Sequence, residues 1–281
     1  MSMKERPKLG RGIEDVSSYF LSPDRHRSRQ PDISSTAAET RSIGVCHPDS
    51  RLIQSCLVTN LALELAKRQL SVIVQDFLPP GEASIRTLMG TIVTQDEQAP
   101  DQALIRLYGL PEIMIVQAGP GQVWKGAGPV PATLDREGSR RWNHVINMGN
   151  DLDFLNSSDA ASDYVLITQT GDKSLLKAYA YLKTMHARNS QSRLHLVMDD
   201  APTPEDAVRL FNRFNGFIKR HLGIDVEFMG NLIQDETLQR SIVERRPLVL
   251  ARDRGETGMA SICSRFLDTM EPSDSRRLEV E

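Results

Sequence analysis

Residues 42–76 constrain the fold of this chain more than any other stretch. Ser42–Cys46 is a short apolar run flanked by polar residues, and residues 71–74 form a second, β-branched run that ends at Asp76. Between the two runs, residues 57–67 place leucine and alanine at helical spacing. A strand, a helix and a strand in this order predict two parallel strands in a buried sheet, with the first loop at their carboxyl edge.

The stretch that leads into this helix, residues 47–55, is predicted to be mainly a loop. A loop before a helix N-terminus is where α/β proteins usually bind phosphate, because free backbone N–H groups and the helix dipole converge there. Such a loop needs glycines, and a lysine followed by Ser or Thr. Residues 47–55 contain no glycine and no lysine, Pro48 lacks a backbone donor, and Asp49 would repel a polyphosphate. The stretch therefore has the position of a nucleotide site without its chemistry.

The rest of the chain continues the alternation of strands and helices. Strands are predicted at residues 112–117, 142–148, 163–168 and 194–198, and helices at residues 85–90, 102–108, 175–182, 202–221 and 258–270. This order predicts an α/β protein with a three-layer, doubly wound, mostly parallel sheet and helices on both of its faces.

Taken together, residues 42–270 resemble the ParA/MinD family of deviant P-loop ATPases, and most closely its FlhG/FleN branch of flagellar regulators. Asn60, Leu61 and Ala62 are similar to the family's NLA motif, and Asp76 to the aspartate that ends the second strand. Near the C-terminus, the family's order of glycine, apolar, acidic and basic positions is similar to that of Gly230, Ile233, Asp235, Ile242, Arg246 and Pro247. The resemblance implies a P-loop NTPase-like fold.

At the positions that bind nucleotide in the family, this chain carries other residues. The resemblance aligns the signature lysine with Asp49, the phosphate-binding lysine with Gln54, the Walker B aspartate with Asn147 and the adenine-side asparagine with Asp199. It aligns the loop glycines with Ser50, Arg51 and Ile53, and an acidic residue of a later helix with Lys177. The resemblance thus implies a nucleotide site that has lost its motifs.

Ser55 and Asp76 are the two candidate cofactor-binding residues that remain, as vestiges of an Mg²⁺ site. An alternative role for Asp76 is that of a strand-end residue. We expect no catalytic residues, no metal site and no bound cofactor, although ATP with Mg²⁺ is the ligand that the resemblance implies.

The N-terminal region differs in composition from the α/β region. Residues 1–22 are predicted to contain an interaction helix with Ile13, Val16 and Phe20 on one side, residues 23–41 form a polar linker, and residues 271–281 form a polar tail. The helix could dock into a groove of a partner protein, or it could pack back onto its own domain. A second candidate contact is Trp124, in a loop rich in glycine and proline.

Composition narrows the class of protein. The 281 residues are 40% hydrophobic, enough for one sizeable α/β core, and the net charge of −3 argues against a nucleic-acid binder. Cys46, Cys56 and Cys263 lie in apolar contexts and are predicted to be buried thiols. The sequence shows no signal peptide, no membrane span and no aliphatic face in its tail for membrane insertion, so a cytoplasmic protein is expected.

These features leave three hypotheses for function. The first is a catalytically degenerate pseudo-ATPase that serves as a protein-interaction or regulatory subunit of a membrane-associated or cell-pole assembly, such as flagellar, secretion or polysaccharide machinery. It would be recruited to the inner membrane by a partner, and be a monomer or part of a hetero-complex rather than an ATP-sandwich homodimer. The second is a residual ATPase that uses Ser55 and Asp76. The third is a nucleotide or small-molecule sensor with a pocket lined by His47, Arg51 and Arg86.

Overall fold

The computed structural model describes the greater part of residues 41–270. The described residues are 41–79, 81, 83–89, 93–95, 102–105, 110–111, 113–118, 122, 125, 142–150, 152–233, 236–250 and 258–270. The predicted N-terminal helix, the predicted linker except its last residue Arg41, Trp124 and the polar tail lie outside these residues, so their roles stay predictions.

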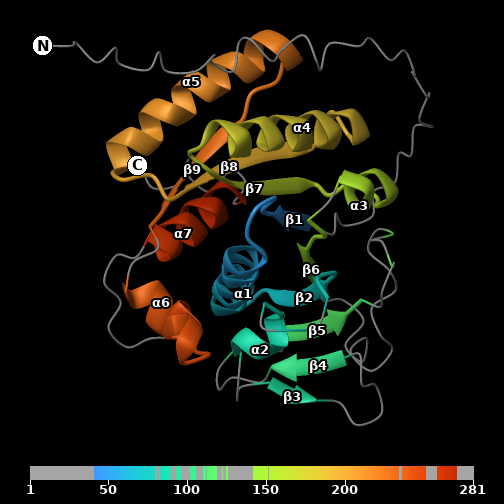
Figure 1. Ribbon diagram of the computed structural model, residues 1–281. Coiled ribbons are helices and arrows are strands. Elements are labelled where there is room, and N and C mark those ends of the chain that lie inside the picture. The colour runs from blue at the N-terminus through green and yellow to red at the C-terminus, as the bar shows by residue number, and fades with distance from the viewer. Residues whose placement is uncertain are drawn as a thin grey trace, which may run out of the picture.

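The described strands form one nine-stranded sheet in the order β3-β4-β5-β2-β6-β1-β7-β8-β9 (Figure 1). The strands from β5 to β9 in this order pair in parallel, and β3 and β4 extend the sheet with antiparallel pairing. The strands are β1 (Ser42–Cys46), β2 (Ser71–Asp76), β3 (Val93–Gln95), β4 (Gln102–Ile105), β5 (Ile113–Gln117), β6 (Trp142–Asn147), β7 (Asp163–Gln169), β8 (Arg193–Asp199) and β9 (Glu227–Leu232).

Helices cover both faces of this sheet, which confirms the predicted three-layer, doubly wound fold (Figure 1). One face packs against α1 (Arg51–Lys67), α2 (Ile85–Met89), α6 (Glu236–Val243), the 3-10 turn η4 (Leu248–Leu250) and α7 (Gly258–Met270). The other face packs against α3 (Leu152–Ser157), α4 (Asp172–Arg188) and α5 (Pro204–Leu222).

Alternation along the strands divides the core into two hydrophobic clusters. In β7, Val165 and Ile167 belong to the cluster with α1 and α7, whereas Tyr164 and Leu166 belong to the cluster with α4 and α5. Successive side chains of a strand point to opposite faces, so a strand that is apolar at every position is buried on both. This is the physical reason that the short apolar runs of the sequence are strands of a central sheet.

Helix α1 begins earlier than predicted. Residues 51–54 were expected to be loop, but the helix starts at Arg51, and the Ser50 side chain accepts a hydrogen bond from the backbone N–H of Ile53 at 3.3 Å. This is a helix N-cap. The boundary is hard to read from the sequence because most residues of α1 are buried, so its apolar positions do not form a single stripe. The true loop after β1 spans only residues 47–50.

The prediction of a helix at residues 102–108 was wrong for its first part. Residues 102–105 form strand β4, which pairs antiparallel with both β3 and β5. A short apolar run cannot be assigned to helix or strand from its periodicity alone. Pairing with β5 decides the conformation here.

Asn60, of the NLA motif, has a structural role in this fold. Its Oδ1 accepts a hydrogen bond from the backbone N–H of Val249 at 3.0 Å, and its Nδ2 donates to the Cys56 carbonyl at 2.8 Å. Lys67 donates to the Val249 carbonyl at 2.8 Å. These contacts attach turn η4 to α1 and help to explain why a helix in an outer layer is largely buried.

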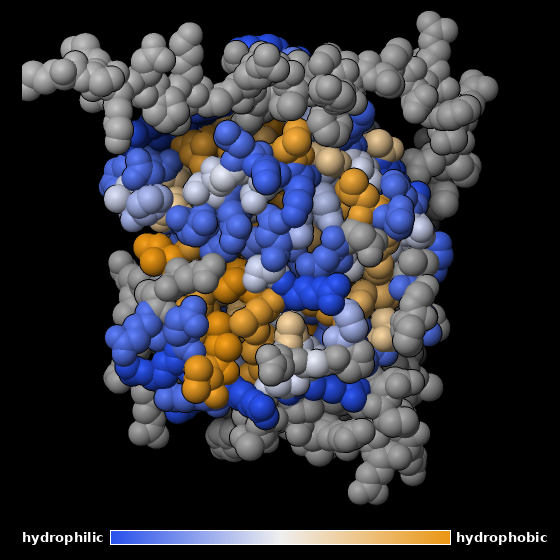
Figure 2. Space-filling model, viewed as in Figure 1, coloured by the Kyte–Doolittle hydropathy of each residue, from blue (hydrophilic) through white to orange (hydrophobic). Residues whose placement is uncertain are grey.

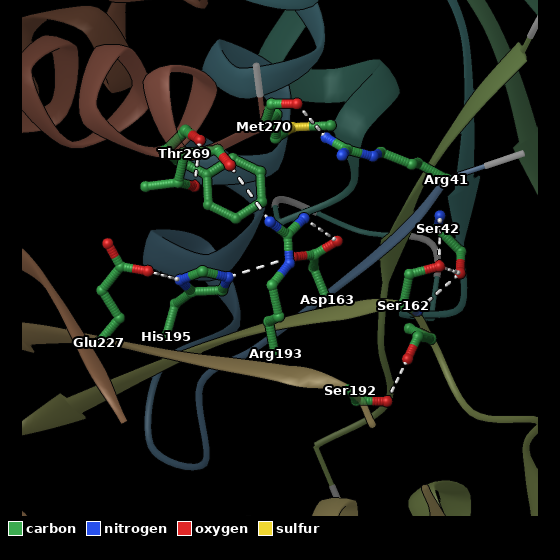
Figure 3. A network of polar contacts seen from close by, with 12 residues as sticks. Arg41, Ser42, Ser162, Asp163, Ser192, Arg193, His195, Glu227, Thr269 and Met270 are labelled. Carbon is green, nitrogen blue, oxygen red and sulfur yellow. Dashed lines mark hydrogen bonds and ion pairs between the residues drawn. The ribbon is translucent and has the colours of Figure 1, made fainter. Parts of the chain in front are cut away.

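A polar network at the amino edge of the sheet holds the end of α7 (Figure 3). Arg193 and Arg41 donate to the carbonyls of Thr269 and Met270 at 3.1 and 2.5 Å. Arg193 also pairs with Asp163 at 2.7 Å, and His195 Nε2 lies 3.2 Å from the same carboxylate. Burial alone would raise the pKa of Asp163, but hydrogen bonds from His195 and Arg193 outweigh it and lower the pKa. The two arginines place positive charge at the negative end of the α7 dipole.

None of the helices in the described part of the chain combines the length and apolar character that crossing a bilayer requires.

Candidate functional site

The candidate site lies at the carboxyl edge of the parallel sheet, where β1, β2 and β6 end side by side. Parallel pairing puts Asp76 of β2 opposite Asn147 of β6. The residues of interest at this edge, all fully or almost fully buried, are His47, Gln54, Ser55, Asp76, Asn147 and Asp199. Buried polar groups need partners, so the hydrogen bonds of these residues decide what the site can do.

Both polar atoms of the Gln54 side-chain amide form hydrogen bonds with the protein. Its Nε2 donates to Asn147 Oδ1 at 2.8 Å and to the Met148 carbonyl at 2.7 Å. Its Oε1 accepts from the backbone N–H of His47 at 2.7 Å. The side chain at the position aligned with the phosphate-binding lysine therefore joins α1 to the loop after β1 and to the end of β6.

Asn147 links the two predicted cofactor-binding residues. Its Nδ2 donates to Ser55 Oγ at 2.9 Å and to Asp76 Oδ1 at 2.8 Å. Asp76 also accepts from the backbone N–H groups of Leu78 and Ile85, each at 3.1 Å. The structure thus places Ser55 and Asp76 on either side of Asn147, and it joins Gln54, Ser55, Asp76 and Asn147 into one network, called here the amide network. The network itself contains no cation.

Burial raises the pKa of Asp76 to about 6. Hydrogen bonds from Ile85, Leu78 and Asn147, and the charge of Arg86, act in the opposite direction but do not outweigh burial. A carboxylate that lacks a directly paired cation is costly to keep ionised away from water.

His47 and Asp199 form a buried pair that connects the loop after β1 to the end of β8. His47 Nδ1 accepts from the backbone N–H groups of Asp49 and Ser50 at 3.2 and 3.3 Å. These bonds assign the ring proton to Nε2, which lies 3.2 Å from Asp199 Oδ2. The sequence did not predict this pair, because the two residues are 152 positions apart.

Asp49 and Lys177 form an ion pair across the same edge. Lys177 Nζ of α4 lies 2.5 Å from Asp49 Oδ1. Burial tends to raise the pKa of Asp49, but hydrogen bonds from Lys177 and Ser174, with the Lys177 charge, lower it. The resemblance aligns Asp49 with a lysine and Lys177 with an acidic residue. The charge at each position is therefore opposite to that in the family, and in this chain the two side chains pair with each other.

The three residues of the predicted sensor pocket do not share a hollow. His47 is fully buried in its pair with Asp199, and Arg86 is half-buried with its charge felt by Asp76. Arg51 is exposed, and it lines a hollow of about 340 Å³ at this edge that neither His47 nor Arg86 lines. The prediction that these three residues line one pocket was therefore wrong. Residues that share a sheet edge can still point into different layers.

Other chemistry is limited among the described residues. They include no group of three or more His, Cys, Asp or Glu side chains placed to hold a metal ion. Cys46, Cys56 and Cys263 are free and buried, as predicted, and burial raises the pKa of Cys56 to about 12 and those of the other two further. Thiols with raised pKa values are poor nucleophiles at neutral pH.

Comparison with solved structures identifies the fold. The MinD cell division protein of Aquifex aeolicus matches with a TM-score of 0.56 at 12% identity, over 83% of this chain and 98% of that chain. MinD of Pyrococcus furiosus matches with a TM-score of 0.54 at 11% identity, over 82% and 100%. The ParA family ATPase of Chlorobium tepidum matches with a TM-score of 0.51 at 15% identity, over 81% and 98%.

Comparison with curated proteins finds a relative in the predicted branch. The antiactivator FleN of Pseudomonas aeruginosa is 22% identical over 101 residues, which is 36% of this chain and 36% of FleN. No model of a protein family matches the chain. The predicted resemblance to the ParA/MinD family and to its FlhG/FleN branch is confirmed by the fold and by this local similarity.

Proposed function

We propose that this chain, which has the fold of the MinD and ParA ATPases and local similarity to FleN, is a catalytically degenerate pseudo-ATPase. It acts as a protein-interaction or regulatory subunit of a membrane-associated or cell-pole assembly, in the cytoplasm and recruited by a partner. The observation that carries the proposal is the amide network of Gln54, Ser55, Asp76 and Asn147, whose side chains bind one another.

Phosphoryl transfer on this fold depends on a lysine, on Mg²⁺ ligands and on backbone donors that stabilise charge. The amide network contains no lysine, and its one carboxylate, Asp76, accepts three hydrogen bonds from the protein. Both donor bonds of Asn147, each worth about 1 kcal/mol net, end on Ser55 and Asp76, so an Mg²⁺ ion would compete with Asn147 for these oxygens. These residues do not fit a metal-bound triphosphate.

The reversed Asp49–Lys177 pair supports the same conclusion. In the family that the chain resembles, the signature lysine lies beside the phosphates of ATP. Here Asp49 would bring negative charge to that place, and its carboxylate already has a cation partner in Lys177. The pair is formed within the chain and involves no nucleotide.

Known relatives favour a role through protein partners. One solved structure of this fold, at a TM-score of 0.53 and 11% identity over 83% of this chain and 97% of that chain, is the MinC:MinD complex of Aquifex aeolicus. FleN is named an antiactivator. We infer that this chain likewise binds a protein, through Ile13, Val16 and Phe20 of the N-terminal segment and through the loop that contains Trp124.

Isothermal titration calorimetry with ATP and MgCl₂ tests the proposal. We expect no heat of binding above dilution and no release of phosphate, with the cell division ATPase MinD of Pyrococcus furiosus as the positive control in the same buffer. Mg²⁺-dependent binding with turnover would instead establish a residual ATPase that uses Ser55 and Asp76. Binding without turnover would establish a nucleotide sensor.

A further inference from the structure

The side of α5 that faces away from the sheet is positively charged. Helix α5 lies in an outer layer of the molecule, and Figure 2 shows hydrophilic residues at the top of the view, where this helix lies. Its acidic residues, Glu205 and Asp206, are confined to the first turn, and residues 207–222 contain no acidic residue. The exposed basic residues of the same stretch are Arg209, Arg213, Lys219 and Arg220. Since the whole chain has a net charge of −3, this surface differs in sign from the rest of the protein.

Three of these basic residues form a stripe along one side of the helix. Arg209, Arg213 and Arg220 are spaced by four and then seven residues, and both spacings return to the same side of an α-helix. The stripe is about 16 Å long. Arg209 pairs with Asp206 at 3.0 Å, whereas Arg213 and Arg220 have neither a hydrogen bond nor an ion pair within the described part of the chain. The helix dipole accounts for Arg220 in the last turn but not for Arg213 in the middle of the helix.

Gly216 lies on the same stripe, between Arg213 and Arg220. Only proline is less favourable than glycine inside a helix, so a glycine in the middle of a helix of 19 residues needs a reason. Gly223 has one, because it ends α5 with a positive φ, and so does Gly258, where a Cβ would lie 2.6 Å from a backbone oxygen. A Cβ on Gly216 would have no heavy atom within 4 Å among the described residues. The described part of the chain therefore gives no reason for this glycine.

The approach of another backbone would explain Gly216. Glycine permits such an approach because it has no side chain, and the distance between two packed helices is set by the side chains at their contact. An α-helix with acidic residues at the same spacings would place carboxylates opposite Arg213 and Arg220, and arginine is suited to bind carboxylates. Val208, 43% exposed, offers an apolar contact near one end of the stripe.

Other occupants suit this face less well. A second copy of α5 would bring arginines against arginines. An extended polyanion such as a DNA duplex would also meet the remainder of the chain, which is net acidic. A bilayer surface would attract the arginines but would give no reason for a glycine between them.

We propose that α5 is the docking face for an acidic α-helix of the protein partner. The two helices cross at Gly216, carboxylates of the partner pair with Arg213 and Arg220, and an apolar side chain of the partner covers Val208. Helix α5 packs on the face of the sheet opposite to α1, which carries Gln54 and Ser55 of the amide network. This assignment rests on the proposed interaction function and gives the chemistry of the partner.

The test titrates the full chain with a blocked alanine-based peptide whose glutamates alternate at spacings of four and three residues. We expect the peptide to shift the NMR amide signals of Gly216 and of the exposed side of α5. Replacing both Arg213 and Arg220 by alanine should weaken binding about tenfold, because two exposed ion pairs are lost. Gly216→Leu should weaken binding by a similar factor and raise the melting temperature, because leucine favours the helix and meets open space here. Weaker binding by a more stable protein cannot result from misfolding.

Two substitutions on the opposite face of the sheet are the matched controls. Ser261→Leu and Arg265→Ala change exposed positions of α7 in the same chemical way, and both variants should bind the peptide as the unchanged chain does.

Several results would overturn the assignment. They are no shift along α5, equal binding of the peptide with glutamine in place of glutamate, and unchanged binding by Gly216→Leu. Tighter binding of a DNA duplex, or of vesicles of phosphatidylglycerol and phosphatidylcholine, that is lost in the arginine variant would identify a polyanion or lipid surface instead. A shift of the α5 signals on Glu14→Lys, without peptide, would assign the face to the N-terminal segment of this chain.

Each of these results leaves the calorimetric test of the pseudo-ATPase untouched. ATP turnover, by contrast, would remove the proposed function and leave peptide binding at α5 to be measured on its own.

Discussion

At the scale of single residues, the site is defined by the loss of opposite charges. The resemblance aligns Gln54 with a lysine and Asn147 with an aspartate, and in this chain the two neutral amides hydrogen-bond each other at 2.8 Å. Replacing a buried charge pair by amides removes the cost of desolvating both ions. Asp76 is the one acid that remains in the network, and it retains that cost.

The raised pKa of Asp76 predicts a pH dependence of stability. Its pKa is about 6 in the folded protein and 3.8 ordinarily, so the folded state binds the proton more tightly. The stabilisation from this proton is fully present below about pH 4 and is lost as pH rises through about 6. The shift of about two pH units corresponds to roughly 3 kcal/mol. Urea unfolding gives the free energy of unfolding of the unchanged chain and of Asp76→Asn at each pH. The difference between the two proteins should change by about this amount from pH 4 to pH 8.

Asp163 provides the matched control for this experiment. Its pKa is lowered in the folded protein, where His195 and Arg193 bind it. Its contribution therefore has the opposite sign, present above the unfolded pKa and lost as pH falls through the folded one. The unchanged chain should lose free energy of unfolding as the pH falls through the pKa of Asp163, and Asp163→Asn should not show this loss. A flat difference for Asp76→Asn between pH 4 and pH 8 would contradict the raised pKa.

At the scale of elements, caps and glycines decide where helices and strands end. Helix α5 begins after Thr203, whose hydroxyl accepts from the Asp206 N–H at 3.0 Å, and ends at Gly223 with φ of 68°. These are a standard N-cap and a left-handed C-cap. Because both signals are local, the sequence predicts α5 to within a few residues.

Two glycines should respond in opposite directions to alanine. Gly216 lies within α5 with no heavy atom within 4 Å of a Cβ, so Gly216→Ala should stabilise the protein by about 0.5–1 kcal/mol. Gly230 has φ of 141°, and its Cβ would lie 3.1 Å from Ile262, so Gly230→Ala should destabilise by about 1–3 kcal/mol. Thermal unfolding of both variants checks this.

Destabilisation of Gly230→Ala would also explain why a glycine occupies this position, which the resemblance aligns with a glycine of the family. The β8–β9 pairing shifts register between Leu196 and Val197, which pair with Phe228 and Gly230. The positive φ of Gly230 lies at this shift, and only glycine adopts it without strain. Equal stability of Gly230→Ala and the unchanged chain would show that the strand relaxes there.

At the scale of the whole molecule, the charges that could join two copies are used within one. Asp49 is paired with Lys177 of the same chain, and the amide network is closed. By resemblance, the family's dimer depends on a lysine at the position of Asp49 and on bound ATP. Light scattering after gel filtration should therefore give the monomer mass of 31.4 kDa, with and without ATP and MgCl₂. A doubling of mass that requires ATP would contradict this.

Much of the fold could be predicted because its determinants are local. The apolar runs at Ser42–Cys46 and at residues 163–168 are buried on both faces, and each run shows this by itself. The order of strands and helices then leaves few topologies. The start of α1 and the strand β4 were missed, because a serine cap and an antiparallel neighbour overrode the apolar pattern.

The candidate site could likewise be predicted only in part. The sequence by itself determined which residues stand at the sheet edge and which chemistry they lack, because the absence of glycine and lysine from residues 47–55 is a property of the residues alone. Only the tertiary structure decided what replaced that chemistry. Gln54 and Asn147 are 93 positions apart, and Asp49 and Lys177 are 128 apart, so their pairing exists only once the parallel strands end at one edge. Local sequence patterns do not predict contacts between residues so far apart, because the order of the strands in the whole sheet decides which residues meet.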